Sequence, residues 1–164
     1  MLGAFCGLQP KISRDTFPDF EVLLDSLSMT AKDAGVIAPI DYAIFQNHGY
    51  MGLYGGLKME DIHRRKKLKK SQKILDHMGS TELAANLFRA TQTEEKLRRD
   101  KVQGKTAANR THHEVGAKVR QTIKELGGAM PEELPATESI KKLKATQHRQ
   151  IGSASLSKKK ATGR

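Results

Sequence analysis

The stretch Asp41–Lys70 reads DYAIFQNHGYMGLYGGLKMEDIHRRKKLKK. It holds all three tyrosines of the chain and runs directly into a basic cluster. Its first residues, around Ile44 and Phe45, are typical of the end of a small helix that packs on a core. Glycine adopts positive φ at no steric cost, so the glycines that follow predict a turn: Gly49, Gly52, Gly55 and Gly56. We expect a compact Gly/Tyr-rich turn that docks a basic helix onto a helical bundle.

The basic helix is expected over Lys66–Met78, KKLKKSQKILDHM. Leu68, Ser71, Leu75 and Met78 recur with the spacing of one helical face. The opposite face carries lysines at the same spacing, and no acidic residue follows four positions later to pair with them. A solvated lysine face is the alternative, but the pattern favours contact with an anion. We therefore predict a nucleic-acid-binding set of six cations: Arg64, Arg65, Lys66, Lys69, Lys70 and Lys73.

Two tyrosines next to this basic run, Tyr50 and Tyr54, allow two interpretations. Aromatic rings beside a basic track hold single-stranded nucleic acid by stacking on its bases. The same rings also serve to cover the apolar edge of neighbouring helices. The pattern favours the second role, and both residues remain candidates for nucleic-acid binding.

Two further helices are expected. Gly79 followed by Ser80 or Thr81 predicts a helix start, and the inner face of that helix comprises Leu83, Leu87, Ala90 and Leu97, widened by Ala84 and Phe88. A third helix, from Thr106 to Leu126, has an apolar face of Ala108, His112, Val115, Val119, Ile123 and Leu126. A histidine on such a face is more often a hydrogen-bonded core residue than a ligand. The short turn after Met78 also permits a DNA-reading helix-turn-helix, which is the weaker interpretation.

The fold class that follows is all-α, a small helical bundle with a Gly/Tyr-rich turn and a disordered basic C-terminal tail. Three segments are expected: 1–30, unassigned apart from a possible short helix at FEVLLDSL; 31–145, the helical domain; and 146–164, the basic tail. One core is expected to contain Leu75, Leu83, Leu87, Val115, Val119 and Ile123.

Charge points toward polyanionic partners, because the formal net charge is +11. Residues 1–56 carry −3, whereas 57–77 carry +5 and 141–164 carry +8. Cys6 is the only cysteine, which excludes an intrachain disulfide. The histidines show no zinc spacing, and no apolar run approaches a membrane span. We expect a cytoplasmic protein without cofactor, metal, small-molecule substrate or membrane partner.

A catalytic site is not expected. Asp41, Asn47 and His48 superficially resemble a nuclease loop. A phosphodiesterase usually gathers carboxylates on a metal beside its base, and no second acid or histidine follows at a suitable spacing. No phosphate-binding loop or Ser/His/Asp signature appears. A non-enzymatic protein is therefore predicted, with a weak nuclease as an alternative.

Three long stretches carry a family resemblance: DYAIFQNHGYMGLYGG, LKKSQKILDHMGSTELAANLFRATQTEEKLRRD and THHEVGAKVRQTIKELGGAMPEELP, followed by SIKKL. Together they resemble the C-terminal part of the bacterial DNA-damage-inducible protein D family, over residues 31–143. The resemblance implies induction in the SOS response and a non-enzymatic role in DNA repair. It further implies modulation of RecA filaments on single-stranded DNA, with the filament or the strand as partner, in the cytoplasm near the nucleoid.

The resemblance supplies no functional residue and leaves a domain unmatched. Family members carry an N-terminal BRO-like domain that is expected to bind DNA, and nothing in this sequence resembles it. We therefore expect a shortened or split family member. A protein-interaction module, or an inactive fragment without the DNA-binding domain, are the alternatives.

Overall fold

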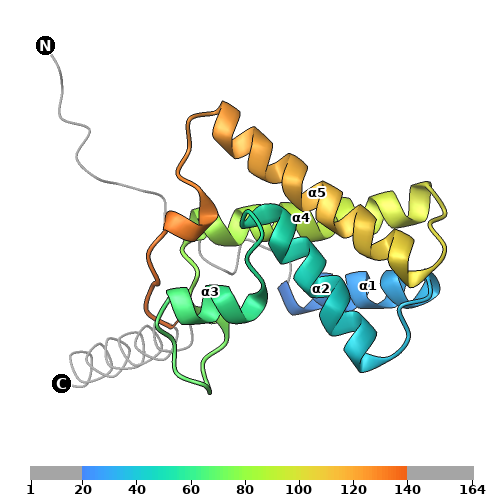
Figure 1. Ribbon diagram of the computed structural model, residues 1–164, viewed down its shortest axis with the longest axis horizontal. Helices are drawn as coiled ribbons and strands as arrows, with labels where there is room; N and C mark the ends of the chain where they lie inside the picture. Colours follow the sequence, from blue (N-terminus) through green and yellow to red (C-terminus); the bar gives the residue numbers. More distant parts are fainter. Residues whose placement is uncertain (1–19, 140–164) are drawn as a thin grey trace, which may run out of the picture.

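Helices form all the regular structure between residues 20 and 139, the residues that the computed structural model describes. Five α-helices and two short 3₁₀ helices follow in order (Figure 1): α1 Phe20–Asp33, α2 Pro39–Leu53, α3 Met59–Arg65, η2 Ile74–His77, α4 Ser80–Arg99, α5 Lys105–Glu125 and η3 Pro131–Glu133. No strand occurs within this range. The prediction of an all-α bundle is confirmed, while the basic tail lies outside the described residues.

The closest packing in the bundle is between α2 and α5, which cross in Figure 1. Gly52 lies on the backbone of α5, where an added Cβ would overlap the His113 carbonyl and approach the Ala117 nitrogen to 2.9 Å. From the other side, a Cβ on Gly116 would lie 2.7 Å from the Gly49 carbonyl oxygen. Side chains at these positions would force the helices apart, so glycine sets their separation.

The predicted Gly/Tyr-rich turn is therefore shorter than expected. Gly49 and Gly52 are helical and buried within α2, and the prediction that they form the turn is wrong. These two glycines allow α2 to pack closely against α5, and neither has a positive φ angle. The turn itself consists of Gly55 and Gly56, whose φ angles are +65° and +101°.

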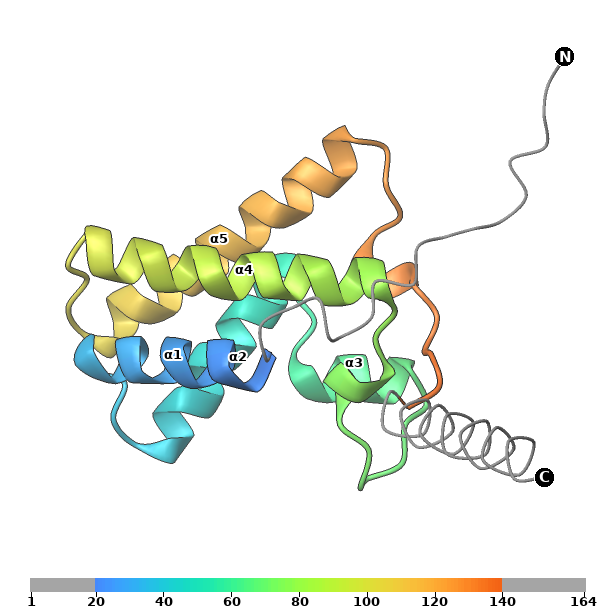
Figure 2. The ribbon, with the colours of Figure 1, turned by 180° about the vertical axis from the view of Figure 1, so that it is seen from behind.

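Residues ahead of the expected domain start also belong to the bundle. The possible short helix at FEVLLDSL is present as the longer α1, which lies alongside α4 (Figure 2). Its inner face places Leu27 and Ala31 fully inside the protein. The helical bundle thus includes residues before 31.

Two groups of buried side chains make up the core. One joins α2, α3, η2, α4 and α5: Tyr50, Leu53, Tyr54, Ile62, Ile74, Met78, Leu83, Leu87 and Val119. The other lies where α1, α2, α4 and α5 meet: Leu27, Ala31, Ala34, Val36, Phe45, Ala90, Leu97 and Ala108. Of the predicted core, Leu83, Leu87, Val115 and Val119 are buried, and Leu75 and Ile123 pack partly buried against the first group.

Two predicted inner-face residues are exposed. The side chain of Phe88 is 55% exposed, and Leu126 is the most exposed large apolar residue of the described chain. Figure 2 shows the physical reason, because α5 leans away from α4 toward its C-terminal end. A residue on the facing side of either helix there meets solvent instead of the other helix.

The predicted basic helix over Lys66–Met78 does not form. Helix α3 ends at Arg65, Lys67 takes a left-handed φ of 54°, and the chain continues through turns to η2. Apolar residues of this segment still pack inward, Ile74 and Met78 among them. The helical spacing was coincidental, and the predicted row of lysines on one face does not exist. No helix-turn-helix results.

The helix crossing generates the first testable prediction. Gly49→Ala should lower the free energy of unfolding by about 3 kcal/mol, because its methyl group overlaps the Arg89 guanidinium and the His112 ring. Gly79→Ala is the control: its Cβ would meet only a Thr137 methyl at 3.5 Å, so the cost should stay below about 1 kcal/mol. Urea unfolding measures both. Equal stability losses would contradict the packing role of Gly49.

Candidate functional site

A stripe of polar side chains is buried along α4. Glu82, Asn86, Arg89 and Thr93 recur at the spacing of one helical face, and all four are buried. Each of the first three stands directly before a buried apolar residue, so a polar and an apolar stripe run side by side. Sequence analysis missed the polar stripe because charged residues in a helix are usually placed outside. Its only signal was its own helical spacing.

Within this stripe, Arg89 is fully enclosed and has no carboxylate beside it. Its Nη1 bonds to Nε2 of His112, and its Nη2 donates to the Asn86 side-chain oxygen at 3.2 Å. The guanidinium lies 4.8 Å from the centre of the Tyr50 ring, a cation–π contact. The missing side chain at Gly49 provides the space for the Arg89–His112 pair.

His112 is held in one protonation state by these contacts. Arginine keeps its protons, so Nε2 of His112 must accept the hydrogen bond. The other nitrogen, Nδ1, then donates to the Phe45 carbonyl at 2.9 Å. Burial, and next the charge of Arg89, hold the pKa of His112 well below its ordinary 6.5. The prediction that His112 is a hydrogen-bonded core residue is confirmed.

At one end of the stripe, Glu82 binds Lys66. The Lys66 Nζ lies 2.8 Å from a Glu82 carboxylate oxygen, and the Lys66 side chain is only 5% exposed. The Tyr54 hydroxyl donates to the second oxygen at 2.7 Å and accepts from Asn86 at 2.9 Å. Burial raises the pKa of Glu82, and the hydrogen bond from Lys66 opposes that rise. Lys66 is thus an internal anchor and does not lie on the predicted cationic surface.

The two tyrosines are interior residues as well. Tyr50 lies against Arg89, and the Tyr54 hydroxyl is hydrogen-bonded to Glu82 and Asn86. Both are buried, so neither ring presents a face to an unpaired base. Of the two interpretations, the structure fits the second: both tyrosines cover the apolar core. The alternative, that they stack on bases, does not fit their burial.

The segment Arg64–Lys73, which we call the basic loop, is fixed from within. Nε2 of His63 lies 3.1 Å from the Lys69 carbonyl oxygen and 3.0 Å from that of Gln72, which it reaches as a donor. The Gln72 side-chain oxygen accepts the Lys69 backbone N–H at 2.7 Å. Since Lys66 is anchored as well, the loop backbone is held on both sides of its turn.

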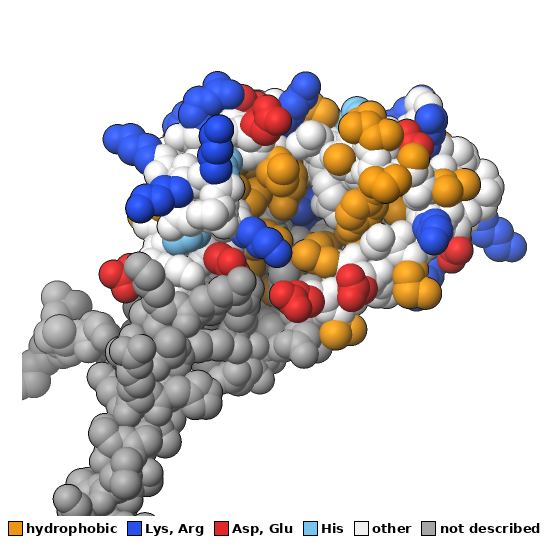
Figure 3. Space-filling model, turned by 90° about the horizontal axis from the view of Figure 1, so that it is seen from below, with side chains coloured by type: hydrophobic (Ala, Val, Ile, Leu, Met, Phe, Trp, Pro, Cys, Tyr) orange, Lys and Arg blue, Asp and Glu red, His pale blue; other side chains and the backbone are white. Residues whose placement is uncertain are grey.

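The basic loop turns most of its cations outward. Lys and Arg side chains gather over α3 and this loop in Figure 3. The exposed cations are Arg64, Arg65, Lys67, Lys69, Lys70 and Lys73. Five of them belong to the predicted set, and Lys67 takes the place of Lys66. The last turn of α3, with Arg64 and Arg65, and the turns that follow it bring these cations together.

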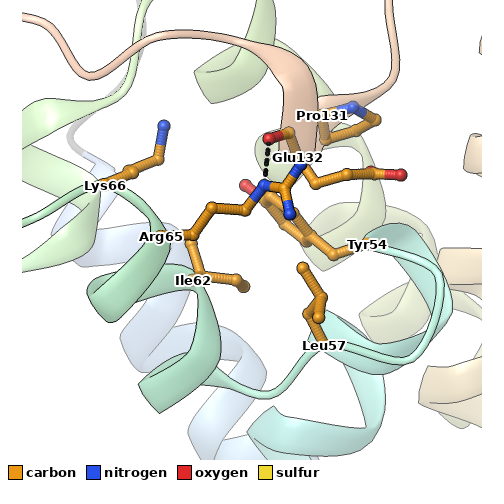
Figure 4. Close-up of a pocket in the computed structure, with 7 residues that line it drawn as sticks. All are labelled: Tyr54, Leu57, Ile62, Arg65, Lys66, Pro131 and Glu132. Atoms are coloured by element: carbon orange, nitrogen blue, oxygen red, sulfur yellow. Dashed lines mark hydrogen bonds between the residues drawn. The ribbon is translucent and has the colours of Figure 1, made fainter.

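A second set of contacts holds the base of the loop. The Nε of Arg65 donates to the Glu132 carbonyl at 2.8 Å (Figure 4). The Glu132 carboxylate accepts two hydrogen bonds from Arg120, each 2.7 Å, which tie η3 to α5. The cavity enclosed here holds about 10 Å³, which is room for about one water molecule. These contacts are therefore structural supports and do not form a ligand pocket.

The residues of the nuclease alternative are engaged separately. Asp41 pairs with Lys105 at 3.2 Å, and the Asn47 side-chain oxygen accepts the Met59 backbone N–H at 3.0 Å. The His48 ring lies edge-on to that of His113. Among the described residues, no group of three or more histidine, cysteine or acidic side chains could hold a metal ion. No described helix is long and apolar enough to span a bilayer.

The different roles of two neighbouring lysines can be measured. Lys66→Gln leaves the buried Glu82 carboxylate without its cation and should cost about 3 kcal/mol of unfolding free energy. Lys70→Gln removes the same charge from an exposed position and should change stability by less than about 0.5 kcal/mol. Chemical denaturation compares them. A Lys66 variant as stable as the Lys70 variant would show that the anchor is unimportant.

A pH dependence follows from His112. The folded state keeps this ring neutral while the unfolded state binds a proton below 6.5, so stability is complete above that pH and declines below it. One such group should remove about 2 kcal/mol between about pH 7.5 and about pH 5. His112→Gln can keep both hydrogen bonds and does not titrate, so its stability should fall less over this interval.

The contribution of His112 is the difference between the pH profiles of wild type and His112→Gln. His48, whose pKa is also lowered, and Glu82, whose pKa is raised, titrate in both. Identical pH profiles for wild type and His112→Gln would contradict the assignment. Independently, ¹⁵N spectra of the imidazole should show Nδ1 protonated and Nε2 unprotonated at about pH 5.5.

Comparison with known proteins places the chain in a family. The family model described as the DinD C-terminal domain matches residues 18–143. A curated relative, DNA damage-inducible protein D of Escherichia coli strain K12, is 72% identical over 114 residues. That alignment covers 69% of this chain and 42% of the relative, so the chain matches less than half of the relative's length. No solved structure matches. The chain belongs to the DinD C-terminal domain family.

Proposed function

We propose that this protein acts in the response to DNA damage, and that its basic loop binds the phosphates of single-stranded DNA within RecA filaments. The role is one of binding and modulating the filament, without chemistry on the DNA. The name of the relative, DNA damage-inducible protein D, supports the physiological setting. Such filaments would place the protein in the cytoplasm near the nucleoid.

The observation that carries this proposal is the basic loop. Six exposed cations lie within ten residues, on a backbone fixed by His63, Gln72 and Lys66. Arg64 lies 3.9 Å from the Asp61 carboxylate, a long and exposed ion pair that leaves the guanidinium accessible. Because the backbone is already fixed, phosphate binding does not have to order the chain at these positions. The loop therefore suits a polyanion better than the same charges on a mobile chain.

The mode of binding should be independent of base sequence. Phosphate contacts position a protein on nucleic acid and carry no sequence information. The tyrosines of this region are buried and offer no stacking platform. Affinity should therefore depend on salt far more than on base composition.

Salt dependence tests the basic loop. Lys67, Lys69, Lys70 and Lys73 are all exposed, so changing all four to glutamine should leave the fold intact. Binding to a fluorescent single-stranded oligonucleotide of about 30 nucleotides should lose about 3 units of its log–log salt slope, at about 0.7 per phosphate contact. The same variant should lose its effect on RecA filament disassembly and strand exchange.

A matched control separates local from overall charge. Glutamine at Lys32, Lys101, Lys105 and Lys124, also exposed, removes the same charge elsewhere on the bundle and should change the slope by less than about 1. Equal effects of the two quadruple variants would mean that only net charge matters. Loss of salt dependence on deleting residues 147–164, with the loop intact, would assign polyanion binding to the tail.

A further inference from the structure

A groove between α4 and α5 is unconnected with the basic loop. It holds about 690 Å³ and is lined by residues 88–99 of α4 and 113–122 of α5. Phe88 forms part of its wall and is 55% exposed, and the lining includes Val115, Ala117 and Val119. An exposed phenylalanine beside a hollow lined by apolar side chains is typical of a docking site for a helix.

The polar rim of this groove is mainly cationic. Lys96, Arg99 and Lys118 line it, against one carboxylate, that of Glu114. Lys118 makes no ion pair with another described residue, whereas Lys96 and Arg99 share Asp100. The groove therefore suits an occupant that combines apolar anchors with negative charge.

The outer face of α1 has this complementary character. Val22 and Met29 are 60% and 69% exposed and lie two turns apart, about 10 Å along the helix. Glu21, Asp25 and Asp33 are exposed on the same side of α1, and these three carboxylates outnumber the one cation there, Lys32. At about 100° per residue, positions 21, 22, 25, 29, 32 and 33 cover one third of the helical circumference. In Figure 3, hydrophobic side chains gather on the side of the molecule away from the basic loop, with acidic and some basic side chains among them. We call Glu21, Val22, Asp25, Met29 and Asp33 the α1 face.

From these two surfaces we infer that the protein self-associates head to tail, with the α1 face of one copy in the α4–α5 groove of the next. The apolar anchors Val22 and Met29 meet the groove around Phe88, and the carboxylates meet Lys118 and its basic neighbours. Because the two surfaces differ, each copy keeps one of each free after pairing. Association thus extends beyond a dimer as concentration rises.

Nucleic acid is a poorer occupant of the same groove. The apolar lining of the groove and the Glu114 carboxylate in it suit a helix better than a phosphate backbone. The α1 face, in turn, repels a polyanion. Both surfaces are small, since one face of a 14-residue helix is about 21 Å long. The association is therefore weak and reversible, of the kind that buries less than about 1,200 Å².

Two variants test the orientation of the contact. The groove variant carries Phe88→Glu and Lys118→Glu, and the face variant carries Val22→Gln and Met29→Gln. All four positions are exposed, so the bundle should fold. In sedimentation velocity at about 200 µM and about 50 mM salt, the wild type should associate and each variant alone should stay monomeric.

The decisive measurement is an equimolar mixture of the two variants. The groove of the face variant and the α1 face of the groove variant are both intact, so the mixture should form a dimer that goes no further. The same mixture in about 500 mM salt should dissociate substantially. A control with Ile44→Glu and Lys124→Glu, exposed residues outside both surfaces, should associate as the wild type does.

Three outcomes would overturn the inference. If the wild-type protein stays monomeric at about 500 µM, self-association is contradicted. Association of the wild type, with none in the mixture of variants, would indicate a symmetric contact. Oligonucleotide binding that is lost only in the groove variant would assign the groove to a nucleic-acid strand. Loop variants leave both surfaces intact, so failure of the proposed function leaves this inference standing.

Discussion

A buried guanidinium without a carboxylate partner constrains the rest of the structure. Placing a charge in the interior is costly unless hydrogen bonds and polarisable groups replace its water. Arg89 has a neutral imidazole, an amide oxygen and an aromatic ring in that role, and its Nε has no partner among the described residues. Each compensating group must therefore keep its position and protonation state. Glycine at 49 is part of the same constraint, since any side chain there would displace Arg89 or His112.

This constraint reaches the surface through a continuous series of contacts. Asn86 bonds to both Arg89 and the Tyr54 hydroxyl, Tyr54 bonds to Glu82, and Glu82 pairs with Lys66 in the basic loop. A buried network of this kind rigidifies the elements that it joins when its members are satisfied. The basic loop is consequently attached to this hydrogen-bonded network in the interior. Its exposed lysines are therefore carried by a backbone that the interior holds in place.

The sequence predicted the elements that depend on local periodicity. The faces of α4 and α5 follow from Leu83, Leu87, Val115 and Val119, because apolar spacing and helix-start residues agree there. The sequence did not reveal the conformation of residues 66–78. Lysines are so frequent there that some of them match a helical spacing by chance. The burial of Lys66 depends on Glu82, sixteen residues away, and the left-handed conformation at Lys67 interrupts the helix directly after it. Glycines 49 and 52 were misassigned for a similar reason: close packing against another helix leaves no local trace that differs from a turn.

The charge distribution links the two proposals physically. Acidic and apolar side chains lie on α1, whereas the basic loop occupies another part of the surface, so a head-to-tail contact would leave the loop uncovered. Successive copies would then present their loops at a regular interval. A long polyanion bound by one copy would raise the effective concentration for the next, and the weak contact between copies would add to each binding step. Binding to a long strand would therefore be cooperative, although a single copy binds weakly, and cooperativity would disappear with the groove variant while single-copy binding to a short oligonucleotide remained.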